Sequence, residues 1–413
     1  MKNKLLYISA FLLLSIGMTA QTSNQGMLYV SEGTQFSTVE RFDNLVSGSF
    51  FNDGDAFIYS HFNNDGIVDF YQNTGLTRFI GRSNQSISGT KVSYLYDTYF
   101  NNTSNTVPFE VSGSINISGE ADLYSGILDN DNFGGEITFN TEAYHINTSD
   151  YSHVDGYVNK VGENEFTFPI GDGGYYRFAG ISAPENESAL FEAKFYFENT
   201  NAMYPHKLRA GILEEIDNQE YWTITKESSA NEDMLITLSW RDVTTPQSMI
   251  DAAEQDALTI VRWNEDTNMW VDEGGAIDLE NKTVTTAVNG YGVFTFGRVK
   301  SDLVLPCNIV VYTAVTPNGD GKNDYFLIDT SNNECARNLN VEVYNRWGVK
   351  VFETDNYGLD GDVFDGFSTG RLTVDEAKQL PTGTYYYILD YQYGNPSENN
   401  RHKQAGFLYL SGN

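Results

Sequence analysis

The chain has 413 residues, and its 56 Asp and Glu against 25 Lys and Arg give a formal net charge of −31 at pH 7. So acidic a surface repels phosphate backbones, and no basic patch interrupts it, which argues against nucleic-acid binding. The length exceeds what one hydrophobic core usually serves, so we expect two or three domains. With 27 Tyr, 26 Phe and only 9 Pro, the composition favours an all-β fold.

Residues 1–20 have the pattern of a secretory signal peptide. Lys2 and Lys4 precede an apolar run from Leu5 to Ile16, and Gly17–Ala20 follow, which are small residues apart from Met18. The apolar run is shorter than the roughly 20 residues that span a bilayer. No later stretch is long and apolar enough to do so, and we therefore expect an exported chain that is soluble or attached to a surface.

Residues 21–153 alternate apolar and polar side chains over short runs separated by Asn-Asp-Gly turns, a pattern typical of β-strands. Their spacing, without a helical interval, suits a solenoid of stacked coils or an irregular β arrangement. Ser83–Gly89 and Ala121–Asp129 resemble rungs of β-helical exoproteins. We therefore favour a short β-solenoid-like region and keep the irregular β region as the alternative.

Residues 154–300 contain clearer strand patterns, for which we expect a β-sandwich. The predicted strands are Ala193–Phe197, Tyr221–Thr225, Leu235–Trp240, Leu258–Trp263, Val284–Val288 and Tyr291–Phe296. Met249–Ala257 is the one longer segment predicted as a helix. Gly171–Gly174 permits a tight turn, and it lacks the Gly-Lys-Ser/Thr of a phosphate loop.

Four tryptophans lie in or beside these strands: Trp222, Trp240, Trp263 and Trp270. Large aromatic side chains at strand positions most often anchor a sandwich core. We favour that interpretation over the alternative, a carbohydrate-binding platform.

Three motifs follow in order near the C-terminus, after a linker at Ser301–Pro306. The first is a turn with Pro317, Asn318, Gly319, Asp320, Gly321, Asn323 and Asp324; the second is a hairpin turn with Asn345, Arg346, Trp347 and Gly348; the third begins a strand and includes Gly383 and Tyr385. Asn, Asp and Gly are favoured in such turns because they tolerate left-handed backbone and form local hydrogen bonds. A last strand is predicted at Gly406–Leu410.

Together the three motifs resemble the gliding motility-associated C-terminal domain, the type B sorting signal of the type IX secretion system in Bacteroidetes. The resemblance covers residues 303–413 and implies a domain that directs passage across the outer membrane. The short strands predicted there suit an Ig-like β-sandwich. It also implies pairing with an outer-membrane barrel of the PorP/SprF type. The segment Asp362–Gly366 departs from the Trp-Asp-Gly form common in the family, with Phe364 as its aromatic residue.

The chain has two cysteines, Cys307 and Cys335, both in this last domain. An exported protein meets an oxidising environment, so we predict a disulfide, with two free thiols as the alternative. Closing a loop of this length stabilises a domain by roughly 3–4 kcal/mol in the chain-entropy model.

Calcium is the one metal for which the sequence contains a candidate site. Asn318, Asp320 and Asp324 have the spacing of a short acidic calcium loop, with oxygen ligands on a Gly-bent turn. The alternative is that these side chains only shape the turn through local hydrogen bonds.

No catalytic constellation stands out. The five histidines are scattered, and neither a His-Glu-x-x-His pattern nor a Gly-x-Ser-x-Gly elbow occurs. With 56 acidic residues, some carboxylate pair suited to glycoside hydrolysis is always available, so none is informative. We expect a protein without enzymatic activity.

These observations lead to the hypothesis of an exported cell-surface adhesin or structural adaptor, attached to the outer membrane and linked by the resemblance to the gliding machinery. Its predicted partners are the type IX translocon, a PorP/SprF-type barrel, and a surface glycan or adhesin. The alternative is an exported carbohydrate-binding or hydrolytic protein that uses the middle sandwich.

Overall fold

The computed structural model describes residues 21–412 apart from 185, 211, 228–233, 289, 301–306, 308, 331–334, 369–378 and 395–399. The predicted signal peptide and linker therefore lie outside the described residues. Within these residues the regular secondary structure is almost entirely β-strand, with one α-helix, α1 (Gln247–Glu254), and a 3-10 turn, η1 (Thr200–Ala202). The all-β prediction is confirmed. None of the described helices is long and apolar enough to cross a membrane.

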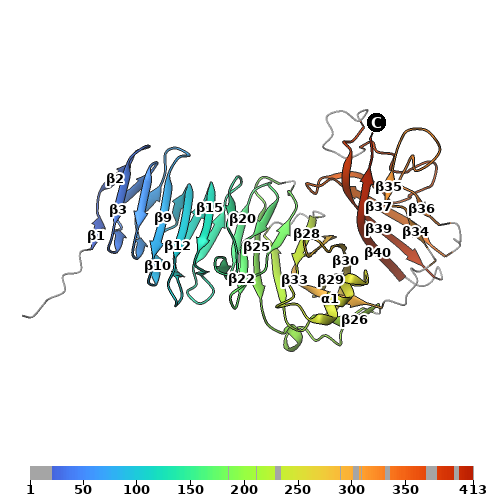
Figure 1. Ribbon diagram of the computed structural model, residues 1–413, viewed down its shortest axis with the longest axis horizontal. Helices are drawn as coiled ribbons and strands as arrows, with labels where there is room; N and C mark the ends of the chain where they lie inside the picture. Colours follow the sequence, from blue (N-terminus) through green and yellow to red (C-terminus); the bar gives the residue numbers. More distant parts are fainter. Residues whose placement is uncertain are drawn as a thin grey trace, which may run out of the picture.

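The N-terminal region is a solenoid in which the chain winds through three parallel sheets, as Figure 1 shows in blue to green. This confirms the solenoid prediction. The first sheet contains β1 (Thr22–Asn24), β4 (Phe42–Asn44), β7 (Phe62–Asn64), β10 (Gln85–Ser88), β13 (Phe109–Val111), β16 (Leu128–Asp129), β19 (Val154–Asp155), β22 (Ile170–Asp172) and the antiparallel β23 (Tyr175–Tyr176). The second contains β2 (Met27–Val30), β5 (Ser49–Asn52), β8 (Ile67–Asp69), β11 (Ser93–Leu95), β14 (Ser114–Ile117), β17 (Glu136–Phe139) and β20 (Val158–Val161). The third contains β3 (Gln35–Thr38), β6 (Asp55–Ile58), β9 (Leu76–Gly81), β12 (Asp97–Asn102), β15 (Glu120–Ser125) and β18 (Tyr144–Ile146).

Like side chains stack from rung to rung inside the solenoid. The rings of Phe42 and Phe62 are stacked with centroids 5.7 Å apart. Asn44 Nδ2 donates to Asn64 Oδ1 at 2.9 Å, and Asn44 in turn accepts from Asn24 Nδ2 at 2.8 Å. Burial of the apolar rows drives the stacking, while the asparagine ladder gives the buried amides the partners that they require.

The middle region continues one of the solenoid sheets, because β20 pairs antiparallel with β25 (Leu190–Tyr196). This sheet extends through β27 (Tyr221–Lys226), β33 (Gly292–Val299), β29 (Leu258–Asn264) and β30 (Met269–Gly274), with β26 (Leu213–Ile216) also on β33. A separate sheet, called here the threonine sheet, consists of β21 (Phe166–Phe168), β24 (Ala179–Ile181), β28 (Met234–Ser239), β32 (Thr283–Val288) and β31 (Ala276–Asp278). Parallel stacking in the first solenoid sheet runs on to β22, beyond the expected boundary at residue 153.

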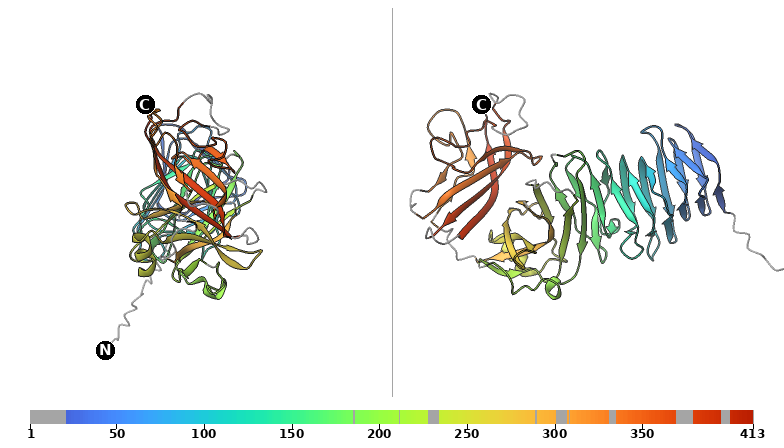
Figure 2. Two further views of the ribbon diagram at one scale, coloured as in Figure 1. Left: turned by 90° about the vertical axis from the view of Figure 1, so that its right-hand side faces the viewer. Right: turned by 180° about the vertical axis from the view of Figure 1, so that it is seen from behind.

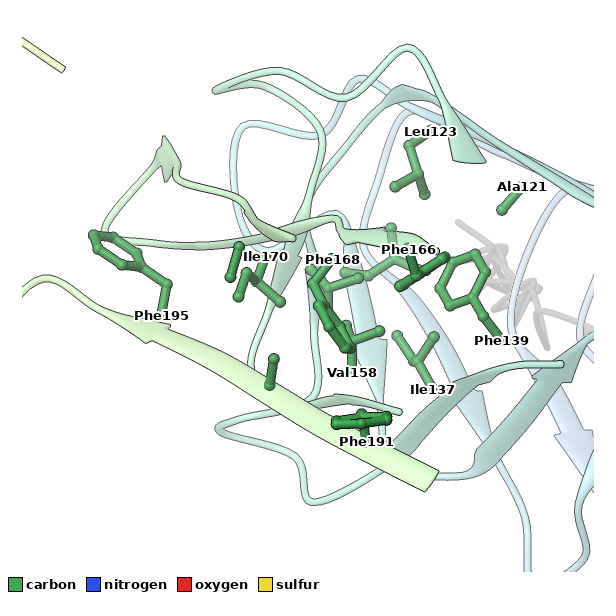
Figure 3. Close-up of a cluster of buried hydrophobic side chains, with 14 of the residues drawn as sticks. Ala121, Leu123, Ile137, Phe139, Val158, Phe166, Phe168, Ile170, Phe191 and Phe195 are labelled. Carbon is green, nitrogen blue, oxygen red and sulfur yellow. The ribbon is translucent and has the colours of Figure 1, made fainter. Parts of the chain in front are cut away.

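One hydrophobic core serves both the solenoid and the middle region, extending from Val30 to Phe296. Figure 3 shows where they join, with Phe139 of β17 beside Phe166 of β21 at a centroid distance of 5.1 Å. The four tryptophans of the middle region are all buried, as expected for core anchors. Helix α1, predicted at 249–257, also buries one face, which includes Met249 and Ala252.

The C-terminal domain has a core of its own and one five-stranded sheet. The sheet order is β35 (Ala314–Val315), β40 (Asn400–Leu410), β39 (Gly383–Tyr393), β37 (Arg337–Tyr344) and β38 (Lys350–Thr354), and a separate pair is formed by β34 (Val310–Val311) and β36 (Ile328–Asp329). Figures 1 and 2 show this domain at the opposite end of the molecule from β1. The Ig-like assignment stays a prediction, and the helical turn expected at 373–380 lies mostly outside the described residues.

Candidate functional site

The first motif is a turn held together by its own backbone donors. The two carboxylate oxygens of Asp324 accept from Gly319 N and Gly321 N, each at 2.7 Å. Asn318 Oδ1 accepts from Asp320 N at 3.0 Å, and Asp320 Oδ1 accepts from Lys322 N at 2.8 Å. Gly319 and Gly321 have φ angles of 75° and 82°, which side chains seldom tolerate. The loop geometry thus accounts for these residue types without a ligand.

The calcium prediction concerned three residues of this turn. Asn318, Asp320 and Asp324 do come together, but their oxygens accept the turn's own N–H groups. Among the residues that the structure describes, no group of three or more His, Cys, Asp or Glu is placed to hold a metal ion. Calcium binding stays a prediction.

The second motif is the hairpin turn between β37 and β38. Asn345 Oδ1 accepts from the backbone N–H groups of Trp347 and Val349, each at 3.0 Å. Gly348 has a φ of 77°, as the turn requires. The Arg346 guanidinium lies 4.2 Å from the centroid of the Trp347 ring, a cation–π contact on an indole that is 47% exposed.

The first and third motifs meet in the core of the C-terminal domain. Phe326, two residues after Asp324 of the first motif, has its ring 5.0 Å from that of Tyr387, two residues after Tyr385 of the third. Tyr385 is buried, and its hydroxyl donates to the carbonyl oxygen of Pro381 at 2.8 Å. Pro317 lies beside Gly366, and Phe364 of the divergent segment is fully buried. The hairpin lies elsewhere, at the contact with the middle region.

The predicted disulfide is confirmed. Cys307 and Cys335 are bonded across a sequence separation of 28, with their Cα atoms 5.5 Å apart. The bond ties the entry of the C-terminal domain to the segment before β37.

The hairpin and its sheet rest against the threonine sheet of the middle region. Tyr344 and Ile388 form an apolar cluster with Leu235 and Ala287. Lys403 Nζ donates to the carbonyl oxygen of Ala287 at 2.5 Å and lies 3.6 Å from the Glu273 carboxylate. This contact was not predicted, because a pairing between distant segments leaves no local signal in the sequence.

Gly348 shows how close the contact is. A Cβ atom placed on it would lie 2.1 Å from Ser182 Cβ, closer than real atoms approach. Glycine is therefore required there both by the backbone angle and by the neighbouring domain.

Residues 309–410 match the profile of a family described as the CHU_C type IX secretion signal domain. The chain carries a type IX secretion signal domain. The matched range falls within residues 303–413, and it contains all three of the predicted motifs. The same comparisons gave no significant match among curated proteins or among solved structures.

A buried ion pair in the middle region also escaped prediction. Arg177 and Glu220 are fully buried and 2.7 Å apart, and the guanidinium lies 5.2 Å from the Trp222 ring centroid. Glu220 also accepts from Thr245 Oγ1 at 2.6 Å. Burial raises the pKa of the neighbouring Asp217, as does, to a lesser extent, Glu220. Enclosed on all sides by core residues, these groups are best suited to holding β23, β27 and α1 together.

Proposed function

We propose that the chain is an exported, non-enzymatic cell-surface protein, an adhesin or a structural adaptor, secreted through its C-terminal domain. The observation that carries the proposal is the family match at residues 309–410. The signal-peptide pattern of residues 1–20 agrees with it, since it supplies the first of the two membrane crossings.

The shape of the cargo supports an adhesive or structural role. The solenoid and the middle region share a sheet and a core, so they form one elongated body. The secretion signal domain lies at the end of this body that is opposite the solenoid tip (Figure 2). A chain held at the outer membrane by this domain, through a PorP/SprF-type barrel, would present the solenoid outward. A role in gliding would then be that of a surface subunit.

The test is to delete residues 303–413 and follow the chain by cell fractionation and surface proteolysis. We expect the truncated chain to remain in the periplasm. Because the deletion also uncovers Leu235 and Ala287, the matched control is full-length Leu235→Ser, which disturbs the same contact but keeps the signal and should be exported. Normal surface display of the truncated chain would refute the proposal.

Attachment has its own test. Removal of the PorP/SprF-type barrel from the producing strain should release the full-length chain into the medium without blocking its secretion. Retention at the surface in such a strain would show that another component holds it.

A further inference from the structure

A cavity of about 550 Å³ lies where three parts of the chain meet. Its floor is the outer face of the threonine sheet, one wall is the last turn of the solenoid, and the other wall is the Arg346–Gly348 hairpin. The volume falls within the roughly 300–1,000 Å³ of small-ligand sites. The cavity exists only while the secretion signal domain is docked on the cargo.

The floor is a row of residues that strand register places side by side. Thr167 pairs with Gly180, Gly180 with Thr237, and Thr237 with Thr285 across β21, β24, β28 and β32. The hydroxyls of Thr237 and Thr285 are 2.8 Å apart. Thr285 is buried and its hydroxyl is engaged by Thr237, so the hydroxyls that a ligand can reach are those of Thr167 and Thr237. Each of these can donate one hydrogen bond and accept others.

Gly180 leaves the middle of this floor open. It is a strand residue without a positive φ angle, and a Cβ atom on it would be 3.4 Å from its nearest neighbour, Thr237 Cβ. A side chain there would thus be tolerated by the backbone and would project over the floor. The glycine deepens the cavity without being required by the fold.

The walls supply aromatic surface. Trp347 is 47% exposed and Tyr144 is 51% exposed, and both line the cavity together with Phe166 and Tyr386. The other four tryptophans of the chain are buried. Trp347 is therefore the indole that a ligand can reach.

The lining is close to neutral, although the chain carries a net charge of −31. Glu165 and Arg346 have opposite charges, and burial lowers the pKa of His145, which keeps that imidazole uncharged at pH 7. An anionic ligand would be repelled by the protein as a whole, and a cation finds a single carboxylate that is offset by a guanidinium. This balance matches an uncharged, hydroxyl-rich ligand.

From this geometry we propose that the cavity binds a neutral oligosaccharide, with a sugar face against Trp347 and sugar hydroxyls on the threonine row. Aromatic rings in wet sites present a large apolar surface beside polar groups, as one face of a sugar ring requires. The site goes beyond export, and it makes the secretion signal domain part of the binding machinery of the mature chain.

The experiment uses purified residues 21–413 and a panel of neutral hexasaccharides of glucose, xylose, mannose and galactose, with oligogalacturonate as the anionic comparison. Binding is measured by calorimetry and by tryptophan emission. We expect at least one neutral sugar to bind and to change the emission, because Trp347 is the exposed indole. Oligogalacturonate should not bind.

Two variants locate the site. Trp347→Ala should weaken binding by about tenfold or more, as for a central aromatic contact. Gly180→Leu should fill the cavity and abolish binding with little change in melting temperature. Tyr71→Ala, which removes a 60% exposed aromatic residue of the solenoid, is the matched control and should bind normally.

The proposal is overturned if folded wild-type protein binds none of the neutral sugars, or if both site variants bind as well as wild type. It is also overturned if sedimentation shows a dimer that Trp347→Ala dissociates, since a second copy would then occupy the surface. None of these results bears on export, which is measured in cells with the deletion described above.

Discussion

The solenoid and the secretion signal domain both place asparagine and glycine at their turns, but for different physical reasons. In the solenoid, a Cβ atom on Gly66 would lie 2.3 Å from the carbonyl oxygen of Gly48, so glycine allows adjacent rungs to approach. In the secretion signal domain, Gly319 has open space around it but a φ of 75°. Asn64 joins a buried ladder, whereas Asn318 caps its own turn. One composition therefore encodes stacking in one region and turn geometry in the other.

The two regions also differ in how their cores are built. The core of the solenoid continues into the middle region, while the secretion signal domain has a separate core and touches the rest through a small apolar cluster. We therefore expect two calorimetric transitions, one for residues 21–300 and one for the C-terminal domain.

The largest effect should come from breaking the buried ion pair. Glu220→Ala leaves Arg177 charged and without its carboxylate partner in the core, which should cost about 3–5 kcal/mol. Only the transition of residues 21–300 should move. Asp242→Ala, which removes an exposed partner of Lys282, is the control and should cost less than about 1 kcal/mol. Equal shifts in both transitions would contradict the separation of the two cores.

Removal of the disulfide should affect only the secretion signal domain. Replacing Cys307 and Cys335 with serine should destabilise the secretion signal domain by roughly 3–4 kcal/mol, because the unfolded chain is no longer constrained. Denaturant unfolding should show the loss in the C-terminal transition alone. A matching loss in the solenoid would mean that the two regions unfold as one unit.

Paired glycine substitutions sharpen the contrast between stacking and turn geometry. Gly66→Ala should cost about 3 kcal/mol because the methyl group meets backbone of the preceding rung. Gly319→Ala should cost about 1–2 kcal/mol from backbone strain alone. Gly319→Asn should be nearly neutral, because asparagine tolerates a left-handed backbone angle. Gly66→Asn should cost as much as Gly66→Ala, because the Cβ atom of either residue meets the preceding rung. Similar costs for asparagine at both positions would contradict this distinction.

The smallest expected effect is a pH dependence in the solenoid. Burial first, and then the charges of Asp172 and Asp129, raise the pKa of Asp155 from 3.8 to about 7. The folded state holds a proton that the unfolded state releases, so this group makes the solenoid less stable as pH rises from about 4 to 7. Because the carboxyl is partly exposed, solvent screening reduces the full linkage energy, and Asp155→Asn should therefore stabilise residues 21–300 at pH 8 by about 1 kcal/mol and have little effect at pH 4.

Melting curves at the two pH values measure this difference. Asp266→Asn, at an exposed carboxylate of the middle region, is the control and should behave alike at both. A gain from Asp155→Asn that is the same at pH 4 and pH 8 would contradict the assigned titration.

Local patterns sufficed to predict much of the fold. Period-two alternation located strands such as Tyr221–Lys226 and Met234–Ser239 to within a residue or two, and the cysteine pair predicted the bond that forms. The turns at 318–324 and 345–348 were found because their geometry depends on residues adjacent in sequence. The glycines of the Asn-Asp-Gly turns were interpreted only as turn formers. Their close approach to the backbone of the preceding rung, as at Gly66, could not be predicted from neighbouring residues.

What could not be predicted depends on tertiary proximity. The ion pair joins residues 43 apart in sequence, and the threonine row becomes visible only once strand register is known. Gly348 was expected to relieve backbone strain, but its contact with Ser182 requires the docked domain. Neither periodicity nor composition carries such information.

Transfer of the C-terminal domain to another protein tests whether residues 303–413 are sufficient for type IX secretion. Residues 303–413 are fused to a periplasmic reporter protein that has its own signal peptide, and the fusion is followed in a strain with an intact type IX secretion system and in one without it. We expect the reporter at the cell surface or in the medium in the first strain and in the periplasm in the second. Periplasmic retention in both strains would contradict this expectation.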